Sequence, residues 1–294
     1  MPFVEVTSST GKTKFKYTIC TPSSEEAKEI DAGLPTILFL HPVSLAEYLF
    51  TGQFSDQQLR RCNLVSFDLR GHGNTFGDSA PCDYGQVEAA EDTIQLMALL
   101  QNSLNLPPCH LVGVSSGTII ALQLAVTQPQ RILSMFLISQ SCTEMPAEVA
   151  GGHHEILDLW TCAFPDKTTT LPELISDAEF GQRQYLFTEP KLSPLVDAIL
   201  SLTSKVAKKR WCYPFLDQYQ ILNHDFNVNR SSTSQMALAQ ITSPVILAYG
   251  SGDVAYPQIY TEQFLHELLE AGVDASLLVI KNAPHCMIPD YSKK

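Results

Sequence analysis

Short runs of apolar residues alternate along the chain with longer stretches in which apolar residues recur every three or four positions. Six of the runs have the length of a strand and are apolar on both faces; they cover residues 36–40, 64–68, 110–114, 132–139, 245–249 and 276–280. Strands buried on both faces are typical of a parallel sheet covered by helices. We therefore predict a doubly wound α/β fold whose parallel core consists of these six strands.

Two further strands are predicted at the start of the chain. Residues 3–6 and 15–20 are β-rich, and Ser8-Ser9-Thr10-Gly11 between them is a turn sequence, so we expect an antiparallel hairpin. Helical spacing of apolar residues predicts helices over 87–102 and 258–270, the second capped by Gly272. The prediction is an eight-stranded, mostly parallel sheet flanked by helices.

The regular alternation stops between about residues 142 and 236. Helical patterns follow one another there without a clear central strand, and strand patterns resume after Ser243-Pro244. We interpret 142–236 as an inserted helical cap, and 1–141 together with 237–294 as the α/β core.

Composition narrows the partners that the protein can have. The chain has 294 residues, 45% hydrophobic and 17% charged, which is typical of a globular protein with a sizeable core. Its net charge is -12, from 19 Lys+Arg against 31 Asp+Glu, which disfavours nucleic acid and stable association with anionic membranes. We expect a small-molecule substrate and a monomer or homodimer.

Cysteine usage and the N-terminal sequence point to the cytoplasm. The eight cysteines are scattered without a Cys-x-x-Cys pair, so we expect reduced thiols and no zinc site. The first residues lack a basic segment followed by an apolar one, and no apolar stretch is long enough to span a bilayer. A cytoplasmic location is therefore our expectation.

A candidate nucleophile lies in Gly113-Val114-Ser115-Ser116-Gly117. A predicted strand ends just before Ser115 and a helical pattern, 118–127, begins just after it. A serine on such a turn is pushed out of the sheet edge, and the flanking glycines let strand and helix approach closely. We predict Ser115 as the nucleophile; Ser116 is the rival, but it lies off the centre of the motif.

Other segments at strand ends carry a family resemblance. They are Leu40-His41-Pro42, Asp68-Leu69-Arg70-Gly71-His72-Gly73, Gly250-Ser251-Gly252-Asp253 and Asn282-Ala283-Pro284-His285. With the motif at Ser115, and with the order nucleophile, acid, histidine, the chain resembles the α/β-hydrolase fold superfamily over nearly its whole length. It looks most like members with a serine nucleophile, either esterase and lipase-like or C–C-hydrolase-like.

The base and the acid of a catalytic triad are expected after the last strands. Active sites of open α/β sheets gather at the carboxyl ends of the strands, and His285 follows the last strand by five residues. Asp253, after the preceding strand, matches the family's usual position for the acid that orients the histidine. Glu144 is the reserve candidate, since some family members place the acid there.

A metal site is not expected. The segment His154-Glu155-Ile156-Leu157-Asp158 comes near to a zinc-protease helix, but Asp158 stands where the second histidine ligand is required. We therefore predict a site without metal or cofactor.

The resemblance also implies an oxyanion hole and a structural loop. Backbone N–H groups of Ser116 and Val43 are the expected donors, because Pro42 has none. His41-Pro42 departs from the more frequent His-Gly at this loop. The segment from Asp68 to Gly73 is mainly structural in the family, so His72 is not the expected base.

These residues predict acyl transfer to Ser115 followed by hydrolysis. The expected substrate is an ester, thioester or lactone of a small, fairly apolar molecule. A serine rather than an aspartate at position 115 argues against dehalogenase and epoxide-hydrolase chemistry. The alternatives are cleavage of a C–C bond next to a ketone, a ligand receptor that retains the triad with little turnover, and a cofactor-free peroxidase side activity.

Overall fold

The structure is a computed structural model that describes residues 2–104, 107–141, 144–188 and 192–291. Its sheet has the strand order β1-β2-β4-β3-β6-β7-β8-β9, with β5 paired to β2. The strands are β1 (Phe3–Ser8), β2 (Gly11–Cys20), β3 (Thr36–Leu40), β4 (Asn63–Phe67), β5 (Phe76–Gly77), β6 (Cys109–Val114), β7 (Ile132–Ile138), β8 (Val245–Gly250) and β9 (Ala275–Ile280). The predicted α/β fold is confirmed.

The strands of the sheet pair as the apolar pattern of the sequence predicts. From β4 to β9 the neighbouring strands are parallel, while the hairpin β1–β2 and its contact with β4 are antiparallel. All eight predicted strands are present. The additional strand, β5, has only two residues, both exposed, so it carries no apolar alternation by which it could have been predicted.

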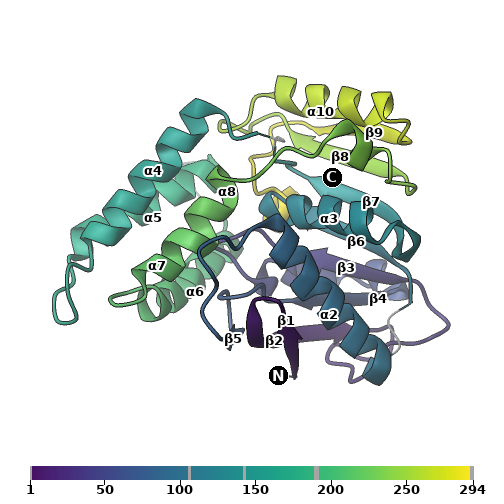
Figure 1. The fold of residues 1–294 in the computed structure, drawn as a ribbon, viewed down its shortest axis with the longest axis horizontal. Helices are drawn as coiled ribbons and strands as arrows, with labels where there is room; N and C mark the ends of the chain where they lie inside the picture. Colours follow the sequence, from purple (N-terminus) through teal and green to yellow (C-terminus); the bar gives the residue numbers. More distant parts are fainter. Residues whose placement is uncertain (1, 105–106, 142–143, 189–191, 292–294) are drawn as a thin grey trace.

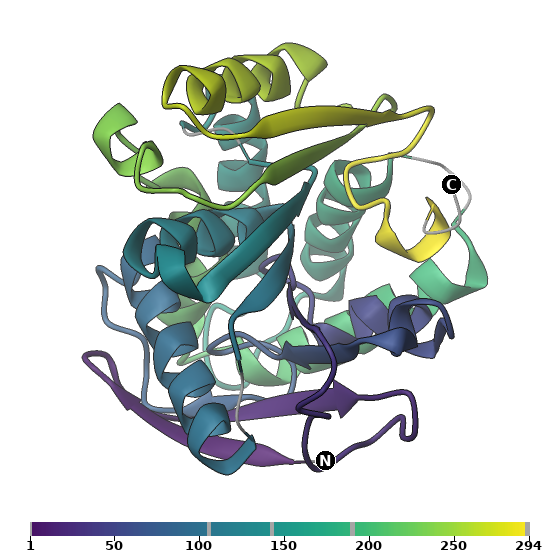
Figure 2. The same ribbon diagram turned by 90° about the vertical axis from the view of Figure 1, so that its right-hand side faces the viewer.

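Helices cover both faces of the sheet (Figures 1 and 2). One face packs against α2 (Gln86–Leu104), α3 (Ser116–Thr127) and α10 (Gln258–Glu270) in the larger apolar cluster. The other packs against η1 (Glu47–Phe50), α1 (Thr51–Ser55) and α11 (Ile288–Tyr291). Side chains of one strand alternate between the two clusters: Leu38 and Leu40 belong to the first, Phe39 to the second. The remaining short helices are η2 (Leu59–Arg61), η3 (Pro129–Arg131) and α9 (Gln235–Leu238).

A group of helices lies between β7 and β8 in the sequence and together on one side of the sheet (Figure 1). They are α4 (Ala147–Cys162), α5 (Pro172–Phe187), α6 (Pro194–Arg210), α7 (Leu216–Tyr219), η4 (Gln220–Asp225) and α8 (Phe226–Val228). They have a small apolar cluster of their own, in which the rings of Trp160 and Tyr219 stack at 5.0 Å. We call these helices the cap; that they form a separate domain with the predicted bounds remains our interpretation.

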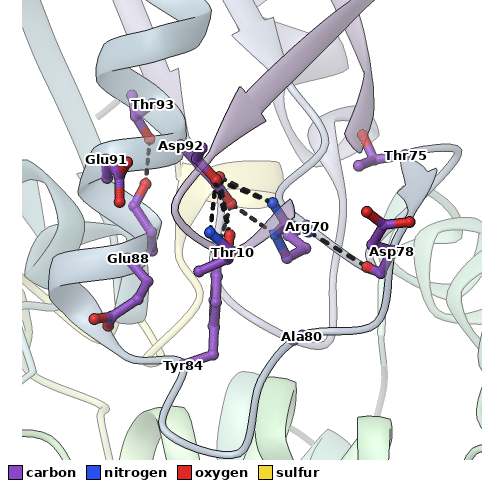
Figure 3. A network of polar contacts seen from close by, with 12 residues as sticks. Thr10, Arg70, Thr75, Asp78, Ala80, Tyr84, Glu88, Glu91, Asp92 and Thr93 are labelled. Atoms are coloured by element: carbon purple, nitrogen blue, oxygen red, sulfur yellow. Dashed lines mark hydrogen bonds and ion pairs between the residues drawn. The ribbon is translucent and has the colours of Figure 1, made fainter. Parts of the chain in front are cut away.

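The loop after β4 is fixed by a buried ion pair (Figure 3). Arg70 donates from Nε to Oδ2 of Asp92 over 2.7 Å and from Nη2 to Oδ1 over 3.0 Å, and both side chains are 2% exposed. The Tyr84 hydroxyl donates to the same carboxylate. Removing one partner of such a pair leaves a buried charge and costs about 3–5 kcal/mol. The pair therefore anchors the loop to α2.

Arg210, at the end of α6, connects the cap to the same loop. Its guanidinium donates to the backbone oxygens of His72, Gly73 and Thr75 over 3.2, 3.1 and 2.6 Å. A planar guanidinium with five N–H donors is suited to several carbonyls at once. This end of the cap is thus attached to the core.

Within the described part of the chain, no helix is both long enough and apolar enough to cross a membrane.

Candidate active site

Ser115 occupies a strained turn between β6 and α3. Its φ is +50° and its ψ is -119°, a conformation that costs free energy for a residue with a side chain. The turn is possible because its neighbours are glycines: a Cβ on Gly117 would lie 2.2 Å from the oxygen of Leu40, and one on Gly113 would lie 2.8 Å from the oxygen of Gly117. The motif therefore has the local geometry expected of a nucleophile elbow.

The structure brings Ser115, His285 and Asp253 into one hydrogen-bonded chain. Oγ of Ser115 lies 2.8 Å from Nε2 of His285, and Nδ1 of His285 lies 2.6 Å from Oδ2 of Asp253. His285 is fully buried and Asp253 is 8% exposed. These residues follow β6, β9 and β8, so parallel strand ends place them together.

Further hydrogen bonds hold Asp253 and His285 in place. The second carboxylate oxygen of Asp253 accepts hydrogen bonds from the N–H groups of Ala255 and Tyr256, at 2.9 and 3.0 Å. The backbone oxygen of His285 accepts a hydrogen bond from the Ser139 hydroxyl. With Nδ1–H directed at Asp253, the Nε2 atom of a neutral His285 faces Ser115 as an acceptor.

The two expected oxyanion donors lie next to each other. The Val43 N–H donates to Oγ of Ser116 over 2.8 Å, and both residues line the same cavity as Ser115. Ser44 follows with φ +66°, and its hydroxyl donates to Oδ1 of Asn223 in η4. The loop after β3 is thus connected both to the nucleophile turn and to the cap.

The alternatives named from the sequence lie elsewhere. Glu144 is exposed, and no hydrogen bond connects it to His285 in the described structure. His154 is exposed on α4, and its Nδ1 donates a hydrogen bond to the backbone oxygen of Ala150.

The described residues contain no group of three or more His, Cys, Asp or Glu that could hold a metal. The seven described cysteines are free thiols; Cys142 lies outside the described residues.

Three cap residues at the site were not predicted. Tyr185 from α5 places its hydroxyl 3.4 Å from Nε2 of His285, and its ring lies 4.9 Å from the imidazole. His153 from α4 and His224 from η4 also line the cavity. Periodicity predicts that a helix has an apolar face, but not which side chains it presents to a catalytic centre.

The cavity in front of Ser115 is narrow, and its lining combines polar and apolar groups. Its volume is about 30 Å³, room for one or two water molecules. Hydroxyl, amide and imidazole groups contribute to its lining, together with Ile156, Leu157 and Leu186. None of the described residues that line it is Lys, Arg, Asp or Glu.

Two buried histidines behind the site make stability depend on pH. Burial lowers the pKa of His41 to about 4 and that of His72 to about 3. Nε2 of His41 accepts the Leu69 N–H at 2.9 Å, a bond that protonation breaks. Below the ordinary pKa of about 6.5 the unfolded chain binds protons that the folded chain excludes, so stability is lost as the pH falls.

His153 of the cap, whose pKa burial also lowers to about 4, adds to this loss, so we expect the free energy of unfolding to fall by about 4 kcal/mol between pH 6.5 and pH 4.5. Burial raises the pKa of Asp68 to about 6, which acts in the opposite direction over this window and offsets one histidine. Urea denaturation at four pH values measures the change. A free energy that stays constant or rises on acidification contradicts the prediction.

Comparisons with known proteins identify the family to which the chain belongs. Residues 37–293 match the model of the Alpha/beta hydrolase family. The chain is 26% identical over 123 residues to the putative carbamate hydrolase RutD of Variovorax paradoxus, covering 42% of this chain and 41% of that protein. It is 32% identical over 109 residues to the dihydrolipoyllysine-residue acetyltransferase component of the acetoin cleaving system of Cupriavidus necator, covering 36% and 27%. The chain thus spans less than half the length of these curated relatives.

Solved structures share the fold over nearly the whole chain. A thermophilic esterase from Thermogutta terrifontis superimposes with a TM-score of 0.72 at 15% identity, covering 97% of this chain and 92% of that one. The carboxylesterase CesB from Bacillus subtilis gives a TM-score of 0.67 at 16% identity, covering 97% and 85%. From the family match and the shared fold it follows that the chain belongs to the alpha/beta hydrolase family.

Proposed function

We propose that this protein is a serine hydrolase that cleaves an ester, thioester or lactone of a small molecule through an acyl-Ser115 intermediate. The observation that carries the proposal is the buried hydrogen-bonded chain from Ser115 through His285 to Asp253. A serine hydroxyl is a weak nucleophile unless a base takes its proton, and His285 is placed to do so.

In the first half-reaction, Oγ of Ser115 attacks the scissile carbonyl while Nε2 of His285 accepts the hydroxyl proton. Asp253 holds the tautomer with Nδ1–H and stabilises the imidazolium that forms. The tetrahedral intermediate collapses to the acyl-enzyme as His285 gives its proton to the departing oxygen or sulfur. Water, deprotonated by the same histidine, then releases the acid and restores Ser115.

The negative charge of each intermediate is assigned to the backbone N–H groups of Ser116 and Val43. In the structure the Val43 N–H donates to the Ser116 hydroxyl. The oxyanion would replace that hydroxyl as its acceptor, after rotation of the short Ser116 side chain. Two such donors are typical of acyl-transfer enzymes, and losing one commonly costs 10²- to 10³-fold in rate.

Two kinds of comparison support hydrolysis of small molecules. The curated relative from Variovorax paradoxus is named as a carbamate hydrolase, and two of the proteins with this fold are named as esterases. The small volume of the cavity disfavours a bulky substrate. The proposed mechanism needs no metal and no cofactor.

Covalent labelling tests the proposal directly. A fluorophosphonate should add one probe to the folded wild type, seen by intact mass, because an activated serine displaces its fluoride. The Ser115→Ala variant should remain unlabelled, whereas Ser55→Ala, which removes an exposed serine on α1, should label like the wild type. Folded wild type without an adduct would count against a serine hydrolase; a labelled protein that turns over no ester would favour a receptor or a C–C hydrolase.

A further inference from the structure

Two histidines that line the cavity next to Ser115 each have an enclosed imidazole nitrogen that the described protein leaves without a hydrogen bond. The two atoms are Nε2 of His153, on α4, and Nε2 of His224, on η4. Both atoms are enclosed, and His224 as a residue is only 7% exposed. Buried polar atoms are nearly always paired, because an unpaired one costs free energy. Two of them on residues that line one cavity indicate a ligand group that completes the pairing.

The other ring nitrogen of His224 is already paired, which leaves Nε2 for a ligand. Its Nδ1 lies 2.7 Å from Oδ1 of Asp225, to which it donates. In the neutral imidazole Nε2 is then an acceptor, and in the imidazolium it is a donor. The residue lies on the π-helix η4, a type of helix that frequently occurs at functional sites.

His153 lines the same cavity, and its imidazole is uncharged. Its ring lies 5.0 Å from that of Tyr185, which in turn lies beside His285. Burial, with smaller contributions from His224 and Arg230, lowers the pKa of His153 to about 4. Because it is neutral at ordinary pH, it offers one nitrogen as donor or acceptor and carries no charge to balance an anion.

The charge distribution outside the cavity also disfavours an anionic ligand. A groove between α4 and α5 shares His153, Ile156 and Tyr185 with the cavity, so these side chains form the wall between the two. Three carboxylates, those of Glu148, Glu155 and Asp177, line this groove, and none of its described lining residues is Lys or Arg. An approaching anion would be repelled at the groove and would find no fixed cation inside.

We propose that His153 and His224 bind an uncharged hydroxyl group of the substrate while its scissile carbonyl lies at Ser115. A hydroxyl donates one hydrogen bond and accepts others, so it donates to Nε2 of a neutral His224 and accepts from His153 in the tautomer with Nε2–H; it accepts from both when His224 is protonated. The inference rests on the proposed function and narrows its substrate to a hydroxylated ester. It replaces the fairly apolar substrate expected from the sequence with one that has a polar end.

Matched pairs of simple esters test this inference. Methyl 3-hydroxybutyrate is compared with methyl butyrate for a hydroxyl on the acyl side, and 2-hydroxyethyl butyrate with propyl butyrate for the alcohol side. Monomethyl succinate, which carries a free carboxylate, serves as the anionic ester in the comparison. We expect kcat/KM, measured by titration of the released acid, to be about 10- to 100-fold higher for one hydroxylated ester than for its partner. The anionic ester should be the poorest substrate.

Histidine variants assign that preference to the two nitrogens. In His153→Leu and His224→Leu the ratio of kcat/KM within the preferred pair should fall toward one, with fluorophosphonate labelling reporting that Ser115 remains in a folded site. His153→Gln, which keeps a polar end, should retain part of the ratio. His266→Leu, on the exposed side of α10, should leave it unchanged.

The failures of the two proposals are distinguishable. If the wild type cleaves methyl butyrate without preferring a hydroxylated ester, or prefers the anion, the inference is overturned and the proposed hydrolase stands. If the preference persists in both histidine variants, the inference is equally wrong. If the folded wild type neither turns over any ester nor is labelled by the fluorophosphonate, both proposals are overturned.

Discussion

Replacing Ser115 with alanine is expected to lower kcat for a p-nitrophenyl ester by about 10⁴- to 10⁶-fold. Alanine removes the atom that forms the acyl-enzyme in the proposed mechanism, while the proposed oxyanion donors and the cavity remain. What activity is left comes from those donors acting on direct attack by water. Initial rates with KM determined separately measure the effect.

The exposed Ser55→Ala variant serves as the matched control and should keep the wild-type rate. A melting temperature close to that of the wild type would show that Ser115→Ala is folded. Residual activity within tenfold of the wild type, after removal of contaminating esterases, would rule out Ser115 as the nucleophile.

Changing Asp253 to asparagine should lower kcat by about 10⁴-fold with little change in KM. Oδ1 can still accept the two backbone hydrogen bonds, so the turn should persist. The amide nitrogen would then face Nδ1 of His285 as a donor and force the proton to Nε2, where it blocks acceptance from Ser115. The loss therefore arises from the wrong tautomer of His285.

Glu144→Gln is the informative comparison, since Glu144 is the other carboxylate that the sequence offered as the acid. It is exposed, and its substitution should leave kcat unchanged. A large loss in Glu144→Gln together with a small one in Asp253→Asn would reverse the assignment. Single-turnover measurements would show whether acylation or deacylation carries the effect.

The strand core was predictable because the central parallel strands are largely buried on both faces, which leaves a continuous apolar run in the sequence; the edge strand β9 keeps such a run although none of its residues is fully buried. The turn at Ser115 was predictable because glycines are required where backbone approaches backbone, as at Gly117 beside Leu40. Val43 and Ser116 could be named as the expected oxyanion donors from their positions in the motifs. The hydrogen bond between the Val43 N–H and the Ser116 hydroxyl could not, because it depends on a side-chain rotamer.

The cap was predictable only as a set of helices. His153, Tyr185 and His224 come from three helices far apart in the sequence, and their meeting beside Ser115 depends on how these helices pack. The π-helix η4 could not be predicted from the sequence either, because one additional residue in a turn leaves no distinct apolar period. In our proposal, substrate recognition resides in this part of the molecule.

The three carbonyl contacts of Arg210 make the two sides of the cap mechanically unequal. In the proposed reaction, a cavity with room for one or two waters must widen to admit an ester and release an acid. The end of α6 is held by Arg210, and the end of α5 is held where the Leu186 oxygen accepts the Cys286 N–H at 2.7 Å, so we expect the widening motion in α4. The rate of that motion would set an upper limit on turnover, even for a substrate whose chemistry at Ser115 is fast.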